Sequence, residues 1–538
     1  LGRYDNQAAT GKEVETAMNL DQITQVRGLP ANETAMLRRL INTWSGKLTR
    51  NKIRYNYYSY KNRLKDFGIS IPDKLKDVET VVGWPAKAVD ALAVRSRFDG
   101  FIFEGGDNAV MAEIVKRNRF PRLYQQAARS ELINSCSFLT VSAGRESEAP
   151  AIISAYSCLT GAAEWDRRNK RIAYGLTVID TKRKDDGSEE PVWVNLYTDE
   201  ATWEIKKDDL GWTSRKVPHE MGRPLMEPLV FRPSLERPFG VSRINRAVMS
   251  ITDSAVREAL RTEVGAEFYT SPQKYILGAD EGLLDGKDKW EAYIGNILAI
   301  TRDEDGNSPQ VGMFSQGSMQ PHTEYMRSLA ARFSGETSIP ISELGVIHDN
   351  PASAEAIYAA KESLLCEAED MNDINGDALC EVAKMALAIA GGKRLDELDE
   401  QEQSVMPRFK NPARPSLVSQ ADAITKVISA LPWVAESEVA LEEFGFNDNQ
   451  IRRLRDDKRK AEANAMIAAQ MQQPQGEGKD ATMYEMSSII KAFRTGKISM
   501  KNAITLFERI GVDEQEARDI LADAKDVEET ITEEGDEE

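Results

Sequence analysis

The period of the hydrophobic residues changes twice along this chain, and that change limits the folds open to it. Before residue 135 the apolar residues recur at helical spacing, as Leu37, Leu40 and Ile41 illustrate. From 137 to 231 they alternate, or run as β-branched and aromatic residues. After 240 the helical period returns. The sequence therefore predicts an α+β fold that is mainly helical, with one β-rich part.

The helical spacing predicts individual elements. In the first half, helices are expected at 33–66, 85–97, 109–117, 121–135 and 241–268. In the second half, they are expected at 321–334, 353–390 (kinked near 375), 419–430, 436–443, 449–472, 482–495 and 499–526. Short strands are expected at 274–277, 292–301 and 310–314. A linker at 472–478 and an acidic, disordered tail complete the chain, since nine of the last sixteen residues are acidic.

Charge and cysteine usage exclude several classes of protein. The 69 Lys and Arg residues against 87 Asp and Glu residues give a net charge of −18, which excludes tight binding to DNA or anionic lipid by bulk charge. No apolar run of about 18 residues is present, so we expect no membrane partner. The start lacks both a signal-peptide pattern and an initiator Met, and the sequence leaves open whether the first residues of the gene product are missing. The four cysteines lack CxxC spacing and are expected to be buried thiols in a reducing compartment.

Motifs for enzymatic chemistry are incomplete. The Gly-Lys pair at Gly46 has Ile41 where a phosphate-binding loop needs its first glycine. His219 begins an HExxH pattern, but Arg223 replaces the second histidine. The acidic run 303–306 has its glycine too early for a calcium loop and favours a hairpin turn. We therefore expect no enzymatic activity, no metal and no cofactor.

Two stretches carry a family resemblance. The first runs from Phe231 to Met249 and reads FRPSLERPFGVSRINRAVM, and it continues through Asp253, Arg257, Ala266-Glu267-Phe268 and Pro272-Gln273. The second is Ile339-Pro340 followed by NPASAEAI from Asn350 to Ile357. Together they resemble the portal proteins of tailed bacteriophages, in which P-x-G-x-S-x-I opens a stem helix and NPxSAEA follows a channel loop.

Shorter matches extend the resemblance toward the N-terminus. They are Tyr57-Tyr58, Ala88-Val89-Asp90 and 98–101, and Tyr60 stands where the family commonly has glycine. The likeness covers roughly residues 33 to 390, in matching order, and nothing after 415.

The resemblance implies a portal-type subunit. Its parts would be an N-terminal arm and wing (1–239), stem helix 1 (240–268), a small α/β clip (269–320), stem helix 2 (321–339), a tunnel loop (340–352), a long helix returning to the wing (353–414), a helical crown (415–471) and a C-terminal region (472–538). Such subunits form a ring, usually of twelve copies, at one vertex of the capsid in the virion, after assembly in the host cytoplasm. The ring is a passive conduit for double-stranded DNA in packaging and ejection. Its other partners would be the terminase large subunit, the head-tail adaptor, the major capsid protein and the scaffold protein.

Candidate site residues follow from the same assignment. The tunnel loop would present Glu343, His348, Asp349 and Asn350 to DNA or simply to water. Seven charged residues would keep much of the surface of stem helix 1 polar: Arg243, Arg246, Arg257, Glu258, Arg261, Glu263 and Glu267. The basic run with Arg452, Arg453 and Arg455 is either a solvated helix face or a phosphate contact in the crown. The tyrosines at 55–60 lie among basic residues, a pattern that either stacks on bases or packs on neighbours.

Two other functions stay open at this point. A minor structural or scaffolding protein of the phage head or baseplate would form a lower-order oligomer without a pore. A metal-dependent nuclease using acidic clusters would cleave DNA with magnesium.

Overall fold

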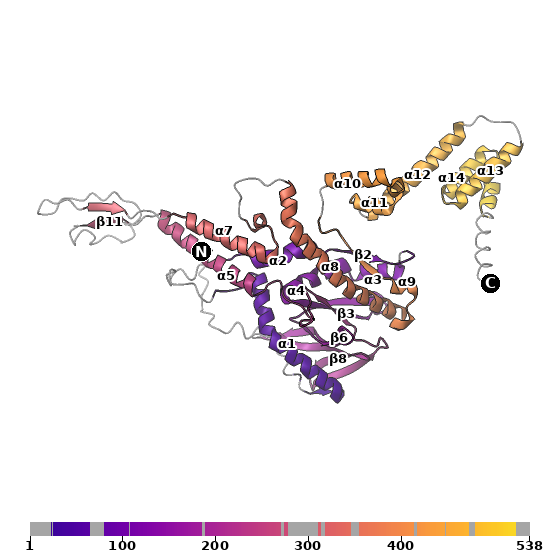
Figure 1. Cartoon of the computed structure of the whole chain (residues 1–538). Coiled ribbons are helices and arrows are strands. Elements are labelled where there is room, and N and C mark those ends of the chain that lie inside the picture. The colour runs from indigo at the N-terminus through magenta and orange to yellow at the C-terminus, as the bar shows by residue number, and fades with distance from the viewer. Residues whose placement is uncertain are drawn as a thin grey trace. The chain divides into compact units, whose positions relative to one another are not determined.

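The computed structural model divides into two compact units, residues 1–413 and 414–538, and each is described by itself. Figure 1 shows the labelled elements of both. The residues that the structure describes are 23, 25–64, 80–106, 108–185, 189–270, 274–277, 310–313, 318–345, 354–413, 417–446, 448–472 and 479–522.

Four helices lead into the sheets of the first unit. They are α1 (Ala31–Tyr58), α2 (Trp84–Ala93), α3 (Ala109–Arg117) and α4 (Phe120–Asn134). The predicted helices are confirmed, and α3 matches to the residue because the Asn108 side chain accepts a hydrogen bond from the Met111 amide and fixes its start. The expectation that the first helix reaches residue 66 is wrong, since Tyr60 takes a left-handed φ of 62° just past its end.

The predicted β-rich part at 137–231 is confirmed as two sheets. One is six-stranded, in the order β1-β9-β8-β7-β6-β5, and the other has the order β10-β3-β4. All pairs are antiparallel except β1 with β9. The strands are β1 (Val26–Arg27), β3 (Cys136–Ala143), β4 (Ala151–Ser157), β5 (Gly161–Asp166), β6 (Arg171–Arg183), β7 (Glu189–Tyr197), β8 (Ala201–Asp208), β9 (Gly211–Pro218) and β10 (Met226–Val230).

Two apolar cores hold this unit together. Helix α1 lays its predicted stripe, including Leu40 and Trp44, on the six-stranded sheet. The larger core lies where α4 and α8 (Ala354–Gly391) pack on the three-stranded sheet, around Phe120, Tyr124 and Leu229. Burying such side chains contributes roughly 1.5–3 kcal/mol each.

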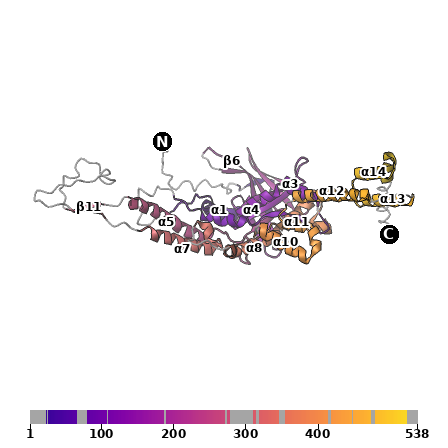
Figure 2. The ribbon, with the colours of Figure 1, turned by 90° about the horizontal axis from the view of Figure 1, so that it is seen from above.

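The chain leaves these sheets through a pair of long helices. Helix α5 (Arg246–Thr270) is 25 residues long, or about 37 Å. It packs beside α7 (Gln320–Thr337), as Figures 1 and 2 both show. Between them in sequence, β11 (Lys274–Leu277) pairs antiparallel with β12 (Gln310–Met313), which confirms two predicted strands. The third predicted strand, 292–301, lies outside the described residues.

The first long helix begins later than predicted. The expected start at 241 is wrong because residues 242–245 make other contacts: Ser242 Oγ donates to the Ile133 carbonyl at 2.6 Å, and the Arg243 amide donates to Leu132 O at 2.9 Å. The Asn245 side chain then accepts from the Val248 amide at 2.9 Å and caps the helix.

The chain returns to the sheets through α8. Before it lies the short 3-10 helix η3 (Ile341–Leu344). Helix α8 runs unbroken across Asn375 and Gly376 and ends, as predicted, at the Gly391-Gly392 pair, where Gly392 has a φ of +60°. After η4 (Leu395–Glu397) and α9 (Glu400–Gln403), β13 (Met406–Phe409) pairs antiparallel with β2 (Phe98–Ile102), a pairing that was not predicted.

The second unit is helical. Its elements are α10 (Leu417–Ala430), η5 (Pro432–Glu436), α11 (Glu438–Glu443), α12 (Asp448–Gln472), α13 (Lys479–Arg494) and α14 (Met500–Arg509). The single helix predicted at 499–526 is wrong. It breaks at Gly511, whose φ is +88°, and resumes at 514. Phe507, Ile489 and Leu521 form the core of its last helices. Most of the predicted linker and the acidic tail lie outside the described residues.

Candidate stem, tunnel segment and crown

Arg243 is buried where the predicted stem meets the sheets. Its guanidinium donates to Ala88 O at 2.7 Å and to Thr337 O at 2.6 Å, and it forms an ion pair with Glu367 at 2.6 Å. The residue is 5% exposed. One side chain therefore ties together α2, the C-terminal end of α7 and α8, just before α5 begins.

The electrostatics of this contact explain why such a buried charge is tolerated. Burial lowers the pKa of Arg243, and the Glu367 carboxylate opposes that shift. Arg232 also reaches Glu367, at 2.5 Å. A cation at the last carbonyls of α7 is favourable because that end of a helix carries partial negative charge. The assignment of Arg243 to the polar surface of a stem helix is wrong: it precedes α5 and is buried.

The other predicted stem arginines lie on α5 and differ in environment. Arg246 is exposed in the first turn. Arg257 is half-buried and donates to Ser254 Oγ at 3.2 Å. Arg261 is half-buried and lies 3.6 Å from the carboxylate of Glu258. The structure therefore leaves Arg246 as the most accessible cation of the four.

Glu258 joins the two long helices. It is 4% exposed, so its assignment to the polar surface is wrong, and its Oε1 lies 2.6 Å from His322 Nδ1 on α7. Where α5 begins and α7 ends, Asn245 Nδ2 donates to Glu336 Oε1 at 2.5 Å. Polar contacts thus fix the register of α5 against α7 at two separate levels.

The tyrosine pair of the resemblance anchors α1 on its neighbours. Tyr57 donates its hydroxyl hydrogen to Asp253 Oδ1 of α5 at 2.8 Å, and Tyr58 reaches Asp90 of α2 at 3.3 Å. Burial and the bond to Asp253 raise the pKa of Tyr57. These two rings are half-buried and pack on neighbouring helices, which agrees with the interpretation that the tyrosines pack rather than stack on bases. Tyr55 and Tyr60 remain exposed.

The predicted tunnel loop is described only in its first part. Glu343, in η3, lies 3.2 Å from Lys87 Nζ, 3.7 Å from Arg95 and 3.8 Å from Lys361. Its carboxylate therefore holds η3 against α2 and α8. His348, Asp349 and Asn350 lie outside the described residues, so their role in a DNA channel stays a prediction.

The predicted crown arginines lie on α12 in the second unit. Arg452, Arg453 and Arg455 are exposed, as is every residue from 452 to 462. Farther along the helix, Lys458 and Lys460 pair weakly with Glu462 and Asp457, at 3.9 and 3.6 Å. The structure thus shows a solvated helix with an accessible basic run, which fits both interpretations of the sequence.

Several of these contacts were missed at the level of sequence. Glu258 follows Ile251 and Ala255 at helical spacing, so its place on the buried stripe could have been inferred. No sequence signal joins Arg243 to Glu367 or Glu258 to His322, because each pair is brought together only by the packing of long helices.

Two kinds of feature are absent from the described residues. No helix in the described ranges is long and apolar enough to cross a membrane. In the same ranges, no three His, Cys, Asp or Glu side chains gather in a way that could hold a metal ion.

Comparison with known proteins shows which proteins are similar to this chain in sequence. A portal protein of Mycobacterium phage L5 is 27% identical over 415 residues, which cover 74% of this chain and 83% of the relative. A portal protein of Mycobacterium phage D29 is 26% identical over 407 residues, covering 73% and 81%.

Solved structures give looser alignments. A chain from "Neck of native GTA particle computed with C12 symmetry" aligns with a TM-score of 0.38 and 14% identity, over 73% of this chain and 98% of that one. A chain from "Virion of native gene transfer agent (GTA) particle" also gives 0.38 and 14%, over 64% and 85%. Both TM-scores are below 0.5, so these alignments add nothing to the argument.

A match to a protein-family model confirms the resemblance to phage portal proteins. A family model described as "Phage portal protein, SPP1 Gp6-like" matches residues 37–463, which is most of the chain. The chain belongs to the SPP1 Gp6-like family of phage portal proteins.

Proposed function

We propose that this portal protein assembles into a ring, with twelve the expected copy number, at the unique vertex of a phage capsid. Double-stranded DNA passes through the ring during packaging and ejection. The terminase large subunit docks on it during packaging and a head-tail adaptor afterwards. The major capsid protein and the scaffold protein contact it during assembly in the host cytoplasm.

The observation that carries this proposal is the exposure of the first half of α7, the second helix of the α5–α7 pair. The first half of α7 is exposed at nearly every position, including Tyr325, which is 44% exposed. Buried positions of α7 begin only at Leu329. A long helix pair that leaves one such side uncovered gains partners when identical copies pack side by side around an axis.

The parts of the ring follow from the resemblance to portal proteins. We assign α5 and α7 to the stem, the segment with β11 and β12 to the clip, and residues 340–352 to the tunnel loop. The sheets and α1–α4 form the wing, and α10–α12 form the crown.

The proposed mechanism is a passive conduit. A DNA duplex carries one negative charge per roughly 1.7 Å of its axis, so a wall of net negative charge repels it and lets it slide. The net charge of −18 supports this mechanism. Bulk acidity excludes tight DNA binding and leaves passage of DNA open.

Mass measurement and imaging test the ring. We expect the purified full chain to form a particle of many subunits with a central pore in negative-stain images. A stable monomer under all conditions would contradict the proposal, and a small oligomer without a pore would favour a minor structural or scaffolding protein. DNA cleavage that requires magnesium would favour a nuclease.

A matched pair of variants tests the stem assignment. Tyr325→Lys places a charge on the exposed side of α7, and Leu210→Lys places the same charge at a loop residue that is 81% exposed. We expect Tyr325→Lys to lower the fraction of protein in rings and Leu210→Lys to leave it unchanged. Equal effects would show that the stem makes no special contribution to assembly.

A further inference from the structure

Two of the four free cysteines face each other at the end of a strand pair. Cys136 begins β3 and Cys158 directly follows β4, and the neighbouring residues Ser137 and Ser157 are paired. The two Sγ atoms lie 3.3 Å apart, and Cys158 Sγ lies 3.0 Å from the Cys136 carbonyl oxygen. A disulfide bond is about 2.0 Å long, so the sulfurs need to approach by about 1.3 Å to form one.

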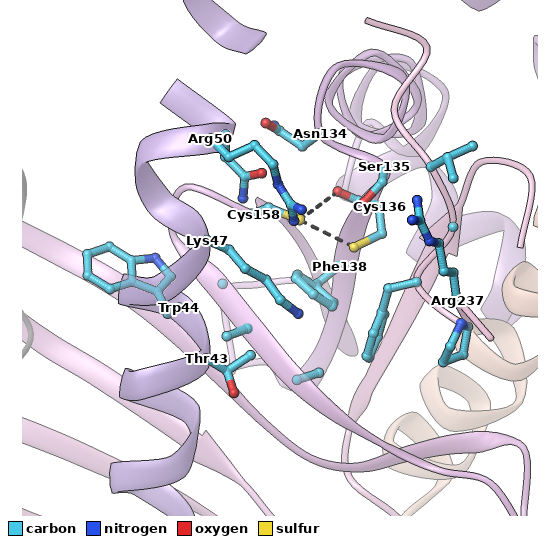
Figure 3. Close-up of a pocket in the computed structure, with 18 of the residues that line it drawn as sticks. Thr43, Trp44, Lys47, Arg50, Asn134, Ser135, Cys136, Phe138, Cys158 and Arg237 are labelled. Carbon is cyan, nitrogen blue, oxygen red and sulfur yellow. Dashed lines mark hydrogen bonds between the residues drawn. The ribbon is translucent and has the colours of Figure 1, made fainter. Parts of the chain in front are cut away.

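The two thiols line a cavity of about 340 Å³ whose charged residues are mostly cations. Lys47, Arg50 and Arg54 come from one face of α1, since they lie three and four residues apart. Arg237 faces them from the segment before α5, and Glu236 is the acidic residue of the lining. Figure 3 shows Lys47, Arg50 and Arg237 around the two sulfurs.

The cations of this cavity repel one another. Burial, together with the charges of Arg50 and Arg237, lowers the pKa of Arg54 to about 10. Arg54 donates to the Asn134 carbonyl oxygen at 3.1 Å, a neutral acceptor. An anion in the cavity would relieve this repulsion, which makes an anionic reagent a better occupant than a neutral or cationic one.

The two thiols differ in reactivity. The hydrogen bond with Cys136 lowers the pKa of Cys158, and Lys47 and Arg54 act in the same direction. The same hydrogen bond, with burial, raises the pKa of Cys136. Cys158 is half-buried, whereas Cys136 is 3% exposed. Because the thiolate is the nucleophile in thiol chemistry, Cys158 is the attacking residue.

We propose that Cys158 and Cys136 form a dithiol modification site that reacts with small anionic disulfides and closes to an intramolecular disulfide. The Cys158 thiolate attacks one sulfur of the reagent, forms a mixed disulfide and releases the other half as a thiolate. Cys136 then loses its proton to solvent and attacks Cys158 Sγ, which releases the second half. The two cysteines are oxidised and the reagent is reduced to two thiols.

The sequence predicted that all four cysteines are buried thiols in a reducing compartment. That prediction is wrong for Cys366, which is exposed, and Cys380 is half-buried. These two cysteines therefore serve as internal controls in the same chain, because neither lines the cavity.

The test treats the reduced full chain with oxidised glutathione, an anionic disulfide, and in parallel with cystamine, a cationic one. Peptide mapping by mass spectrometry follows each cysteine with time. We expect glutathione to produce the Cys136–Cys158 disulfide, with Cys158 reacting at least about tenfold faster than Cys366. Cys136→Ser should trap glutathione on Cys158, and Cys158→Ser should leave Cys136 reduced. Cystamine should react more slowly at Cys158.

A matched pair of charge variants tests the role of the cavity. Lys47→Gln removes a lining cation, and Lys52→Gln makes the same change on the same helix outside the lining. We expect Lys47→Gln alone to slow the reaction of Cys158 with glutathione. Faster reaction with cystamine, faster reaction at Cys366, or no disulfide product would each overturn the proposal, and the comparison of the two reagents needs no variant that could misfold.

Discussion

His322 Nδ1 on α7 lies 2.6 Å from Glu258 Oε1 on α5, and the glutamate is only 4% exposed. Arg261 approaches the other carboxylate oxygen at 3.6 Å. The contact sits in the half of the α5–α7 pair that is remote from Leu329 and Phe333, which belong to the main core. It is therefore a polar link between the two helices outside the part of the pair that belongs to the main core.

Loss of this link should loosen the helix pair locally. We expect His322→Ala to leave Glu258 with a weaker partner and to cost about 1–3 kcal/mol of local stability. Amide hydrogen exchange should then speed up in the first turns of α7 and around Glu258. Thr323→Ala, at the next and exposed position, is the control and should change neither. Equal exchange in both variants would contradict a special role for the link.

Arg243 and Arg246 are three residues apart and should respond very differently to the same substitution. Arg243→Met removes a buried cation from Glu367 and leaves the Thr337 and Ala88 carbonyls without it, at a cost of about 3–5 kcal/mol. Arg246→Met changes an exposed side chain and should stay within about 0.5 kcal/mol. Thermal unfolding of the purified variants measures the difference. Similar melting temperatures would show that the buried contact contributes little.

These contrasts show what the sequence could predict. Element type followed from local patterns, as in α3, whose Asn108 cap and apolar spacing lie within a few residues of one another. The start of α5 was mispredicted because Ser242 and Arg243 bond to the carbonyls of Ile133 and Leu132, a distant segment. The family resemblance predicted a stem over 240–268, but it could not show that Arg243, the first of the predicted stem arginines, is buried.

The pH dependence of stability should report on Glu131 of α4. Burial raises the pKa of its carboxyl from 4.5 to about 8, against a hydrogen bond from Asn375 Nδ2 at 3.0 Å. The folded state therefore holds a proton that the unfolded state releases, so stability falls as pH rises from about 4.5 to about 8. Glu131→Gln cannot ionise and should remove this part of the slope, which raises the melting temperature at pH 8 relative to the parent.

The control for that measurement is Glu362→Gln, an exposed position of α8. It should leave the dependence of melting temperature on pH parallel to that of the parent chain. If Glu131→Gln also runs parallel, Glu131 is ionised in the folded protein and the expected proton is absent.

Gly240, in the P-x-G element of the family resemblance, should tolerate no side chain. Its φ is +64°, and a Cβ there would lie 2.7 Å from Val230 Cγ1 and against the Phe231 carbonyl. Gly222 has nearly the same φ, +62°, but open space around it. Gly222→Ala should therefore cost only the backbone strain, about 1 kcal/mol. Gly240→Ala should cost clearly more, seen as a lower melting temperature or loss of soluble protein. Equal costs would mean that the surrounding strands shift easily to make room.

The basic run of α12 gives the last prediction, which depends on the proposed passage of DNA. If Arg452, Arg453 and Arg455 contact phosphates, replacing all three by alanine should lower the salt dependence of duplex binding. The slope of log affinity against log salt should fall by about 0.9 for each phosphate that the variant no longer neutralises. Binding measured between low and moderate salt gives this slope.

The control removes the same charge from Lys491, Lys497 and Lys501, which are exposed elsewhere in the second unit. Only the arginine variant should change the slope, since phosphate binding depends on where the cations lie. Equal slopes for the two triple variants would show that the basic run is a solvated helix face.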